Sequence, residues 1–91
     1  MQCTRHIQLY GHVQGVFFRE SLRLMARKLG LNGWVRNCSD GSLEAMLQGD
    51  EATVSAVIEW ARHGPDLARV DKIDIADGYG EYTDFQRLPT R

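Results

Sequence analysis

The residues best suited to binding chemistry lie between positions 11 and 19, which read Gly11-His12-Val13-Gln14-Gly15-Val16-Phe17-Phe18-Arg19. This stretch leads from a strand-like run into a helix-like run, and the first N–H groups of a helix have no partner within it. Its glycines let the backbone turn tightly and approach a ligand, and the helix dipole favours an anion there. Arg19, on the first turn of the expected helix, has a planar set of donors that matches two oxygens of a phosphate or carboxylate. We therefore predict an anion site, most suited to a phosphoryl group, built from backbone amides and Arg19.

The same spacing also fits an ordinary strand-to-helix turn. In that interpretation Gly11 and Gly15 only allow the chain to bend, and Arg19 is a solvated surface residue. The stretch is not a Walker loop, because no Gly-Lys-Ser/Thr follows the glycines, and it is not the dinucleotide-binding pattern G-x-G-x-x-G. Both interpretations remain open on spacing alone.

The hydrophobic pattern of the chain predicts the strands that would position this stretch. Alternating apolar residues indicate strands at residues 4–10, 31–38, 42–48 and 70–76, with a short last strand at 85–88. Along residues 42–48, the apolar side chains of Leu43, Ala45 and Leu47 should face the core. The side chains between them should then lie on an open face of the sheet.

Helical spacing of apolar residues predicts one helix from Phe18 to a stop at Gly30 and a second from an N-cap at Asp50 to a stop at Gly64-Pro65. The resulting order, β-α-β-β-α-β, predicts an α+β fold of the ferredoxin-like split β-α-β sandwich type. Its four-stranded antiparallel sheet has the order 4-1-3-2, both helices cover one face, and a short fifth strand is an optional addition. We expect a single domain over residues 1–91, because this length supports one modest core.

This topology brings a second candidate residue next to the glycine-containing stretch. The first and second strands run parallel, so their C-terminal ends lie at the same edge of the sheet, where α/β sheets also bind ligands. The second strand ends at Arg36-Asn37. Asn37 has an acceptor and donors with which to hold a water beside the anion, but it also fits as a turn residue before Ser39-Asp40-Gly41.

Composition argues against several classes of function. The formal net charge is −1 and no apolar run reaches membrane-spanning length, so we expect neither nucleic-acid nor membrane partners. The N-terminus has polar residues where a signal peptide needs an apolar core, which favours a soluble, cytoplasmic protein, and we expect a monomer. Cys3 and Cys38 fall at opposite edges of the expected sheet, which predicts free thiols. The three histidines lack the spacing of a zinc site, so no metal or cofactor is expected.

Two stretches resemble the sequence motifs of the acylphosphatase family. The first begins at Leu9-Tyr10 and continues through Arg19, and it matches the first family motif throughout. The second is Gly33-Trp34-Val35-Arg36-Asn37, followed by Gly41 and Gly49, with Leu43 in place of a usual valine. The order of the expected elements also matches the family along almost all of the chain.

The resemblance implies hydrolysis of acyl phosphates to a carboxylate and inorganic phosphate, without metal or cofactor. It further implies that Arg19 and the loop amides bind the phosphoryl group and that Asn37 positions the attacking water. The implied substrate-binding residues are Val13, Gln14, Gly15, Val16, Phe17, Phe18 and Arg19, with Arg19 and Asn37 as the catalytic residues. An acyl phosphate has a good leaving group, so such a site needs mainly positioning and charge stabilisation. The substrate phosphate can then accept the proton of the water, and His12 is a weaker candidate for a general base.

Two other functions fit the same topology. A non-catalytic anion-binding or regulatory module would use Arg19 and the loop but would not need Asn37, so the presence of both residues favours an enzyme. An RNA-binding domain needs aromatic residues on the open sheet face. The expected strand at 42–48 instead presents Ser42, Glu44, Met46 and Gln48 there.

Overall fold

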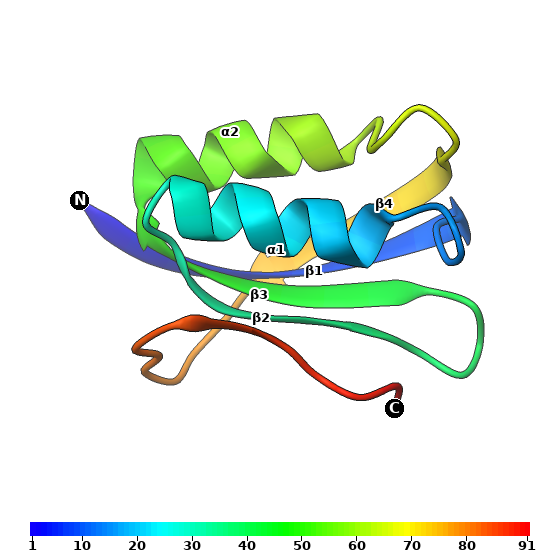
Figure 1. Cartoon of the computed structure of the whole chain (residues 1–91). Helices are drawn as coiled ribbons and strands as arrows, with labels where there is room; N and C mark the ends of the chain where they lie inside the picture. Colours follow the sequence, from blue (N-terminus) through cyan, green and yellow to red (C-terminus); the bar gives the residue numbers. More distant parts are fainter.

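The computed structural model describes residues 1–91, which form β1 (Gln2–His12), α1 (Phe18–Lys28), β2 (Asn32–Asn37), β3 (Leu43–Asp50), α2 (Glu51–Ala61), β4 (Arg69–Asp77) and β5 (Phe85–Arg87). The strands form one sheet in the order β4-β1-β3-β2-β5, and both helices lie on one face of it (Figure 1). This arrangement confirms the predicted ferredoxin-like α+β sandwich, including the optional fifth strand. Because β5 runs parallel to β2, the sheet is mixed rather than wholly antiparallel.

Strand pairing decides where the elements begin and end. The sequence pattern ended the third strand at residue 48, but Gly49 pairs with Cys3 and β3 continues to Asp50. Asp50 is the predicted N-cap of α2, and its carboxylate accepts a hydrogen bond from the Ala52 N–H at 3.2 Å. That helix ends at Ala61, one turn earlier than the glycine-proline stop suggested.

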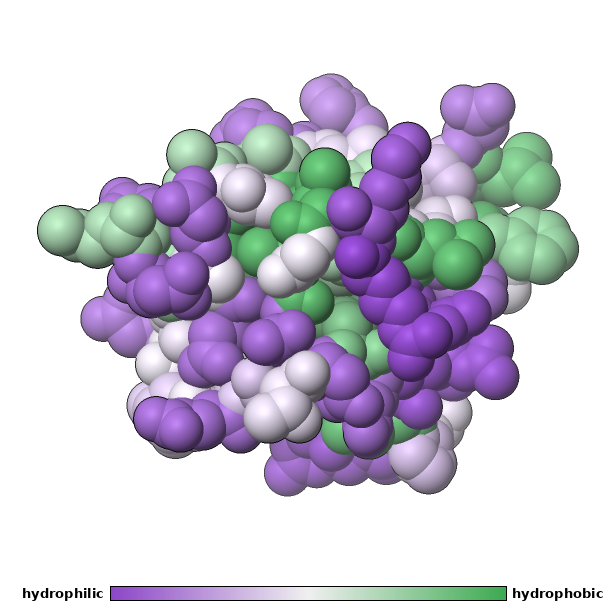
Figure 2. All heavy atoms as spheres, turned by 60° about the vertical axis from the view of Figure 1, so that its left-hand side comes forward, coloured by the Kyte–Doolittle hydropathy of each residue, from purple (hydrophilic) through white to green (hydrophobic).

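The core lies between the sheet and the two helices. α1 buries Phe18, Leu22 and Ala26, and Phe18 packs edge-to-face on Trp60 of α2, with ring centroids 5.4 Å apart. The buried stripe of α2 follows the helical spacing of its apolar residues and consists of Val54, Val57, Ile58 and Ala61. Figure 2 shows a face on which hydrophilic residues predominate, with hydrophobic residues gathered mainly near its centre. Since Phe18 is the first residue of α1, this core also fixes the start of that helix.

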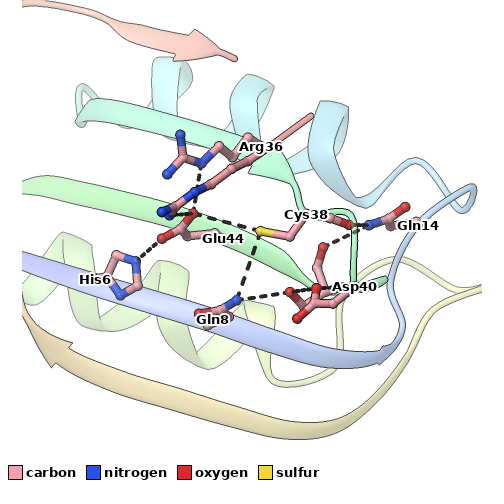
Figure 3. Close-up of polar contacts among 9 residues, drawn as sticks. His6, Gln8, Gln14, Arg36, Cys38, Asp40 and Glu44 are labelled. Carbon is pink, nitrogen blue, oxygen red and sulfur yellow. Dashed lines mark hydrogen bonds and ion pairs between the residues drawn. The ribbon is translucent and has the colours of Figure 1, made fainter. Parts of the chain in front are cut away.

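A cluster of polar side chains covers part of the sheet face opposite the helices (Figure 3). Glu44 is at its centre: Arg36 Nε donates to Glu44 Oε1 at 2.8 Å, and His6 Nε2 lies 2.6 Å from Glu44 Oε2. Cys38 Sγ and Arg91 Nη1 lie 3.8 and 3.9 Å from Oε1. We call these five residues the Glu44 cluster. The sequence predicted that Glu44 would lie on an open face, but it is only 7% exposed, because long side chains from neighbouring segments close over it.

Glu44 is ionised in this environment. Burial raises the pKa of Glu44, but hydrogen bonds from His6 and Arg36 outweigh burial and hold that pKa below its ordinary value. An ionised carboxylate only accepts hydrogen bonds, so His6 Nε2 carries the hydrogen that it shares with Glu44. The guanidinium of Arg36 also packs over Trp34, with the guanidinium carbon 4.5 Å from the centroid of the Trp34 ring.

The remaining sequence predictions concern thiols, metals and membranes. Both cysteines are free thiols, as predicted: Cys38 is buried and Cys3 is partly buried. No three His, Cys, Asp or Glu side chains come together as a group that could hold a metal ion. Both helices, at 11 residues each, are too short to cross a membrane.

Candidate active site

Residues 13–17 connect β1 to α1 and form the loop that the sequence predicted to hold an anion. Its two valines are buried anchors, because Val13 is 1% and Val16 is 3% exposed. Between them, Gly15 has a φ of 74°, a left-handed conformation that favours glycine. A Cβ atom at this position would meet no other atom, so the backbone conformation, not lack of space, requires glycine there.

Phe17 is the N-cap of α1 and the one non-glycine residue of the chain with a positive φ, 64°. This conformation is unfavourable for an aromatic residue, and such strained residues concentrate at functional sites. The Phe17 side chain makes no capping hydrogen bond, which leaves the first N–H groups of α1 uncovered by a cap. The ring itself is 77% exposed.

Gly11 does not belong to this loop, contrary to the sequence-based prediction. It lies within β1, where the pairing with β4 shifts register between Tyr10 and Gly11. A Cβ atom at Gly11 would collide with the carbonyl oxygen of Arg69. Glycine is therefore required there by the close approach of β4, not by a ligand. His12, the weaker candidate base, is the exposed last residue of β1.

A pocket of about 360 Å³ opens between this loop, the start of α1 and the end of β2, at the right-hand end of the sheet in Figure 1. Its lining residues are Val13, Gln14, Gly15, Phe17, Phe18, Arg19, Glu20, Asn37 and Arg87. Arg19 and Asn37 thus lie in one pocket, where the parallel direction of the first two strands placed them. Among the residues expected to bind substrate, Val16 alone is outside the lining, and its side chain is part of the core. His12 is also outside it.

Two lining residues, Glu20 and Arg87, were not singled out from the sequence. Arg87 reaches the pocket because β5 pairs with β2, so that Arg87 lies opposite Val35, two residues before Asn37. The short run at 85–88 indicated a strand but not the strand with which it would pair. The sequence did not predict that Glu20 would line the pocket, because an acidic residue in the first turn of a helix is common without any role in binding.

Arg19 is half-buried and takes part in no ion pair, which distinguishes it from the next arginine of α1. Arg23 donates from Nε and Nη2 to the two carboxylate oxygens of Glu20, at 2.9 and 2.6 Å. The Arg23 hydrogen bond lowers the pKa of Glu20, so this carboxylate stays ionised and already has a partner. The guanidinium of Arg19 therefore keeps its donors for a ligand.

Asn37 ends β2, and its side-chain oxygen Oδ1 is buried without a hydrogen-bond partner in the protein. Its backbone is fixed on both sides, because it pairs with Leu43 and its carbonyl accepts a hydrogen bond from the Arg91 N–H at 3.1 Å. Buried acceptors are normally satisfied, so an exception that lines a pocket points to a ligand. An amide oxygen accepts a hydrogen bond from water, and Asn37 can thus orient a water in this pocket.

Gln14 joins the loop to the turn that follows Asn37. Its Nε2 donates to the carbonyl oxygens of Cys38 and Ser42, at 2.8 and 2.9 Å. Asp40 closes that turn by accepting hydrogen bonds from the hydroxyl and the backbone N–H of Ser42, which lower the pKa of Asp40. The side chain of Gln14 therefore holds the loop beside the strand end, and only its backbone N–H is free to face an anion.

The chain matches known proteins along most of its length. A family model described as Acylphosphatase matches residues 5–87. An acylphosphatase from Thiobacillus denitrificans is 50% identical over 84 residues, which make up 92% of this chain and 94% of that protein. The solved structure of an acylphosphatase from Coxiella burnetii is 36% identical, with a TM-score of 0.90 over 96% of this chain and 93% of that one. The acylphosphatase structure from Bacillus subtilis is 29% identical, with a TM-score of 0.88 over 97% of this chain and 99% of that one.

Proposed function

This chain belongs to the acylphosphatase family and hydrolyses acyl phosphates, and we propose that Arg19, Asn37 and the loop at residues 13–17 carry out that reaction. The observation that carries the proposal is a single pocket with two groups that have no partner. One is the guanidinium of Arg19, and the other is the buried Oδ1 of Asn37. Hydrolysis needs a group that binds the phosphoryl oxygens and a group that orients the water, and one pocket contains a cation and an acceptor suited to these two roles.

The phosphoryl group binds to the backbone N–H groups of the loop and to Arg19. Left-handed residues such as Gly15 and Phe17 are typical of loops in which successive N–H groups face one anion, and the N-terminus of α1 adds its dipole. Negative charge is spread over the phosphoryl oxygens in the transition state. Fixed donors stabilise that charge without rearranging, which is the largest contribution that such a site makes to the rate.

Asn37 accepts a hydrogen bond from the attacking water and orients its oxygen toward phosphorus. The new P–O bond forms as the bond between phosphorus and the acyl oxygen breaks, and the carboxylate leaves with the electron pair. One proton of the water stays on the attacking oxygen and the other passes to a phosphoryl oxygen. The products are a carboxylate and dihydrogen phosphate, so no separate general base is needed.

The reaction proceeds without a metal ion in this proposal. The pocket contains one carboxylate, Glu20, which Arg23 engages through both of its oxygens, and it contains no histidine or cysteine. Divalent cations such as Mg²⁺ are usually bound by free carboxylates. The donor set therefore suits an anion and does not suit a metal.

Steady-state turnover of acetyl phosphate, with and without EDTA, tests this mechanism. We expect the same rate in both conditions, and competitive inhibition by inorganic phosphate and sulfate, because both present tetrahedral oxygens to the same donors. Activity that is abolished by EDTA and restored by Mg²⁺ would rule out the metal-free mechanism. Noncompetitive inhibition by phosphate would rule out a shared site for substrate and product.

We also propose that the enzyme acts as a cytoplasmic monomer, without nucleic-acid or membrane partners. The formal net charge of −1 supports this proposal, since it provides no broad basic surface. Light scattering coupled to size-exclusion chromatography would measure the mass in solution, and a stable dimer would contradict the proposal.

A further inference from the structure

A second pocket, also of about 360 Å³, adjoins the first and shares Glu20 and Arg87 with it. Its other lining residues are Arg23, Arg27 and Gln86, so every lining side chain is polar. The three arginines come from two elements, with Arg23 and Arg27 on α1 and Arg87 on β5. We call this second pocket the arginine recess.

The arginine recess carries a net positive charge that the protein does not neutralise. Its only acidic residue, Glu20, is held by both Arg23 donors and lies 3.6 Å from Arg87 Nη1. Arg87 is half-exposed, and this distance is longer than a hydrogen bond. Arg27 Nε donates to the Phe85 carbonyl at 3.0 Å, which fixes its guanidinium against β5. The terminal nitrogens of Arg27 and Arg87 thus remain available to an anion.

The recess lies within reach of the acyl group of a substrate whose phosphoryl group binds at Arg19. Arg19, Arg23 and Arg27 are spaced by four residues, so they share one side of α1. At a rise of 1.5 Å per residue, successive arginines are separated by about 6 Å along the helix axis. A phosphoryl group at Arg19 therefore places the recess one helical turn away, a distance that a few carbon–carbon bonds can span.

We propose that the arginine recess is an acyl-group subsite, which recognises acyl phosphates that carry a second anionic group a few bonds from the reacting carbonyl. The proposal rests on the proposed function, because it requires the phosphoryl group to bind at Arg19. The second anion, a carboxylate or a phosphate, accepts hydrogen bonds from Arg87 and Arg27. Charge-assisted bonds of this kind are strong and directional.

The test compares two substrates that differ in one charge, succinyl monophosphate and its monomethyl ester. Steady-state kinetics with the full chain at low ionic strength gives kcat/KM for each. We expect the free acid to be preferred by about tenfold, because charge pairs at partly exposed sites are each modest and two arginines contribute. Raising the ionic strength to about 0.5 M should remove most of the preference, since salt screens exposed charges.

Arginine variants identify which side chains produce the preference for the free acid over the ester. Arg87→Gln should lower the ratio of the two kcat/KM values by about threefold to fivefold, and Arg27→Gln by about twofold. The double variant should lose the preference. Arg62→Gln is the matched control, because Arg62 lies beyond α2 and pairs with Glu59, outside both pockets. The ester serves as an internal control, since a variant that merely folds poorly would lose activity on both substrates equally.

The outcomes separate the subsite from the reaction itself. Equal kcat/KM values for acid and ester in the unmutated protein would overturn the subsite and leave the hydrolysis intact. An unchanged ratio in the double variant would likewise show that the arginines do not select the acyl group. Failure to hydrolyse either substrate, or acetyl phosphate, would instead overturn the proposed function on which the subsite rests.

Discussion

The Glu44 cluster (Figure 3) and the active-site pocket lie on opposite faces of the sheet, and they differ in whether their buried polar groups have hydrogen-bond partners. In the cluster, both oxygens of Glu44 have close partners, His6 and Arg36. In the pocket, Oδ1 of Asn37 is buried without a partner and Arg19 makes no ion pair. A buried polar group stabilises a fold only when it is satisfied, and an unsatisfied one costs free energy.

This difference separates residues that maintain the fold from residues that bind. The Glu44 cluster completes its own hydrogen bonds, so changing it should alter the free energy of unfolding and leave turnover nearly intact. The pocket lacks such bonds, and we propose that its donors and acceptor bind the substrate instead. Changes there should alter turnover and cost little stability, since functional sites are often not optimised for stability.

The largest effect should come from Arg19→Ala, which tests whether a change in the pocket alters turnover and not stability. In the proposed mechanism Arg19 contacts the phosphoryl group in both ground and transition states, so phosphate affinity and turnover should fall together. We expect kcat/KM for acetyl phosphate to fall by about a thousandfold, as after loss of a strong oxyanion donor. Calorimetry with inorganic phosphate would measure the affinity. Arg62→Ala is the control, and retention of phosphate affinity in Arg19→Ala would remove Arg19 from the binding site.

The next largest effect should be that of Asn37→Ala, which tests whether Asn37 orients the attacking water. Because the attacking water matters only for the chemical step, kcat should fall by roughly a hundredfold or more while phosphate affinity changes little. The same calorimetric and kinetic measurements apply, with circular dichroism to show that the variant folds. Full turnover in Asn37→Ala would make Asn37 an ordinary strand-end residue, and the contrast with the Glu44 cluster would lose its basis.

The contrast also shows what the sequence could reveal. Hydrophobic periodicity predicted the elements along the chain, and their β-α-β-β-α-β order predicted the strand order of a split β-α-β sandwich. The parallel direction of β1 and β2 then placed Arg19 and Asn37 together. The burial of Glu44 was not predictable, since alternation places its side chain away from the core and only the tertiary structure brings Arg91 and His6 over it. Arg87 was missed for a related reason, because a three-residue strand does not specify which strand it pairs with.

Glycine roles were predictable only in part. A glycine in a sequence indicates either an unusual backbone angle or a close approach of another segment, and the pattern alone does not distinguish them. Gly15 is of the first kind and belongs to the pocket. Gly11 also has a positive φ, but the decisive constraint there is the backbone of β4, which a Cβ atom would strike.

A smaller effect, on stability and not on catalysis, should follow from Glu44→Ala. The substitution leaves His6 and Arg36 without their buried partner, although both are partly exposed and can be solvated. We expect a loss of about 1–3 kcal/mol in the free energy of unfolding, measured by urea titration. The kcat value should change less than about threefold, since no residue of the cluster lines the pocket. A hundredfold loss of turnover would mean that the two faces are not independent.

The smallest effect is the dependence of that stability on pH, and Glu44→Gln isolates it. The pKa of Glu44 is lowered in the folded protein, so folding favours the ionised form. Its contribution is therefore fully present above the pKa of the unfolded chain, about 4.3, and is lost as pH falls through the lower folded value. The stability advantage of the unmutated protein over Glu44→Gln should shrink as the pH falls below about 4. Glu20, Asp40, Asp50 and Asp71 also have lowered pKa values, but they occur in both proteins and cancel in the difference.

Urea unfolding of the unmutated protein and of Glu44→Gln, at a series of pH values, measures the difference in their free energies of unfolding. An advantage that grows as the pH falls below about 4 would mean that folding favours protonated Glu44, and the cluster would then not be the satisfied counterpart of the pocket.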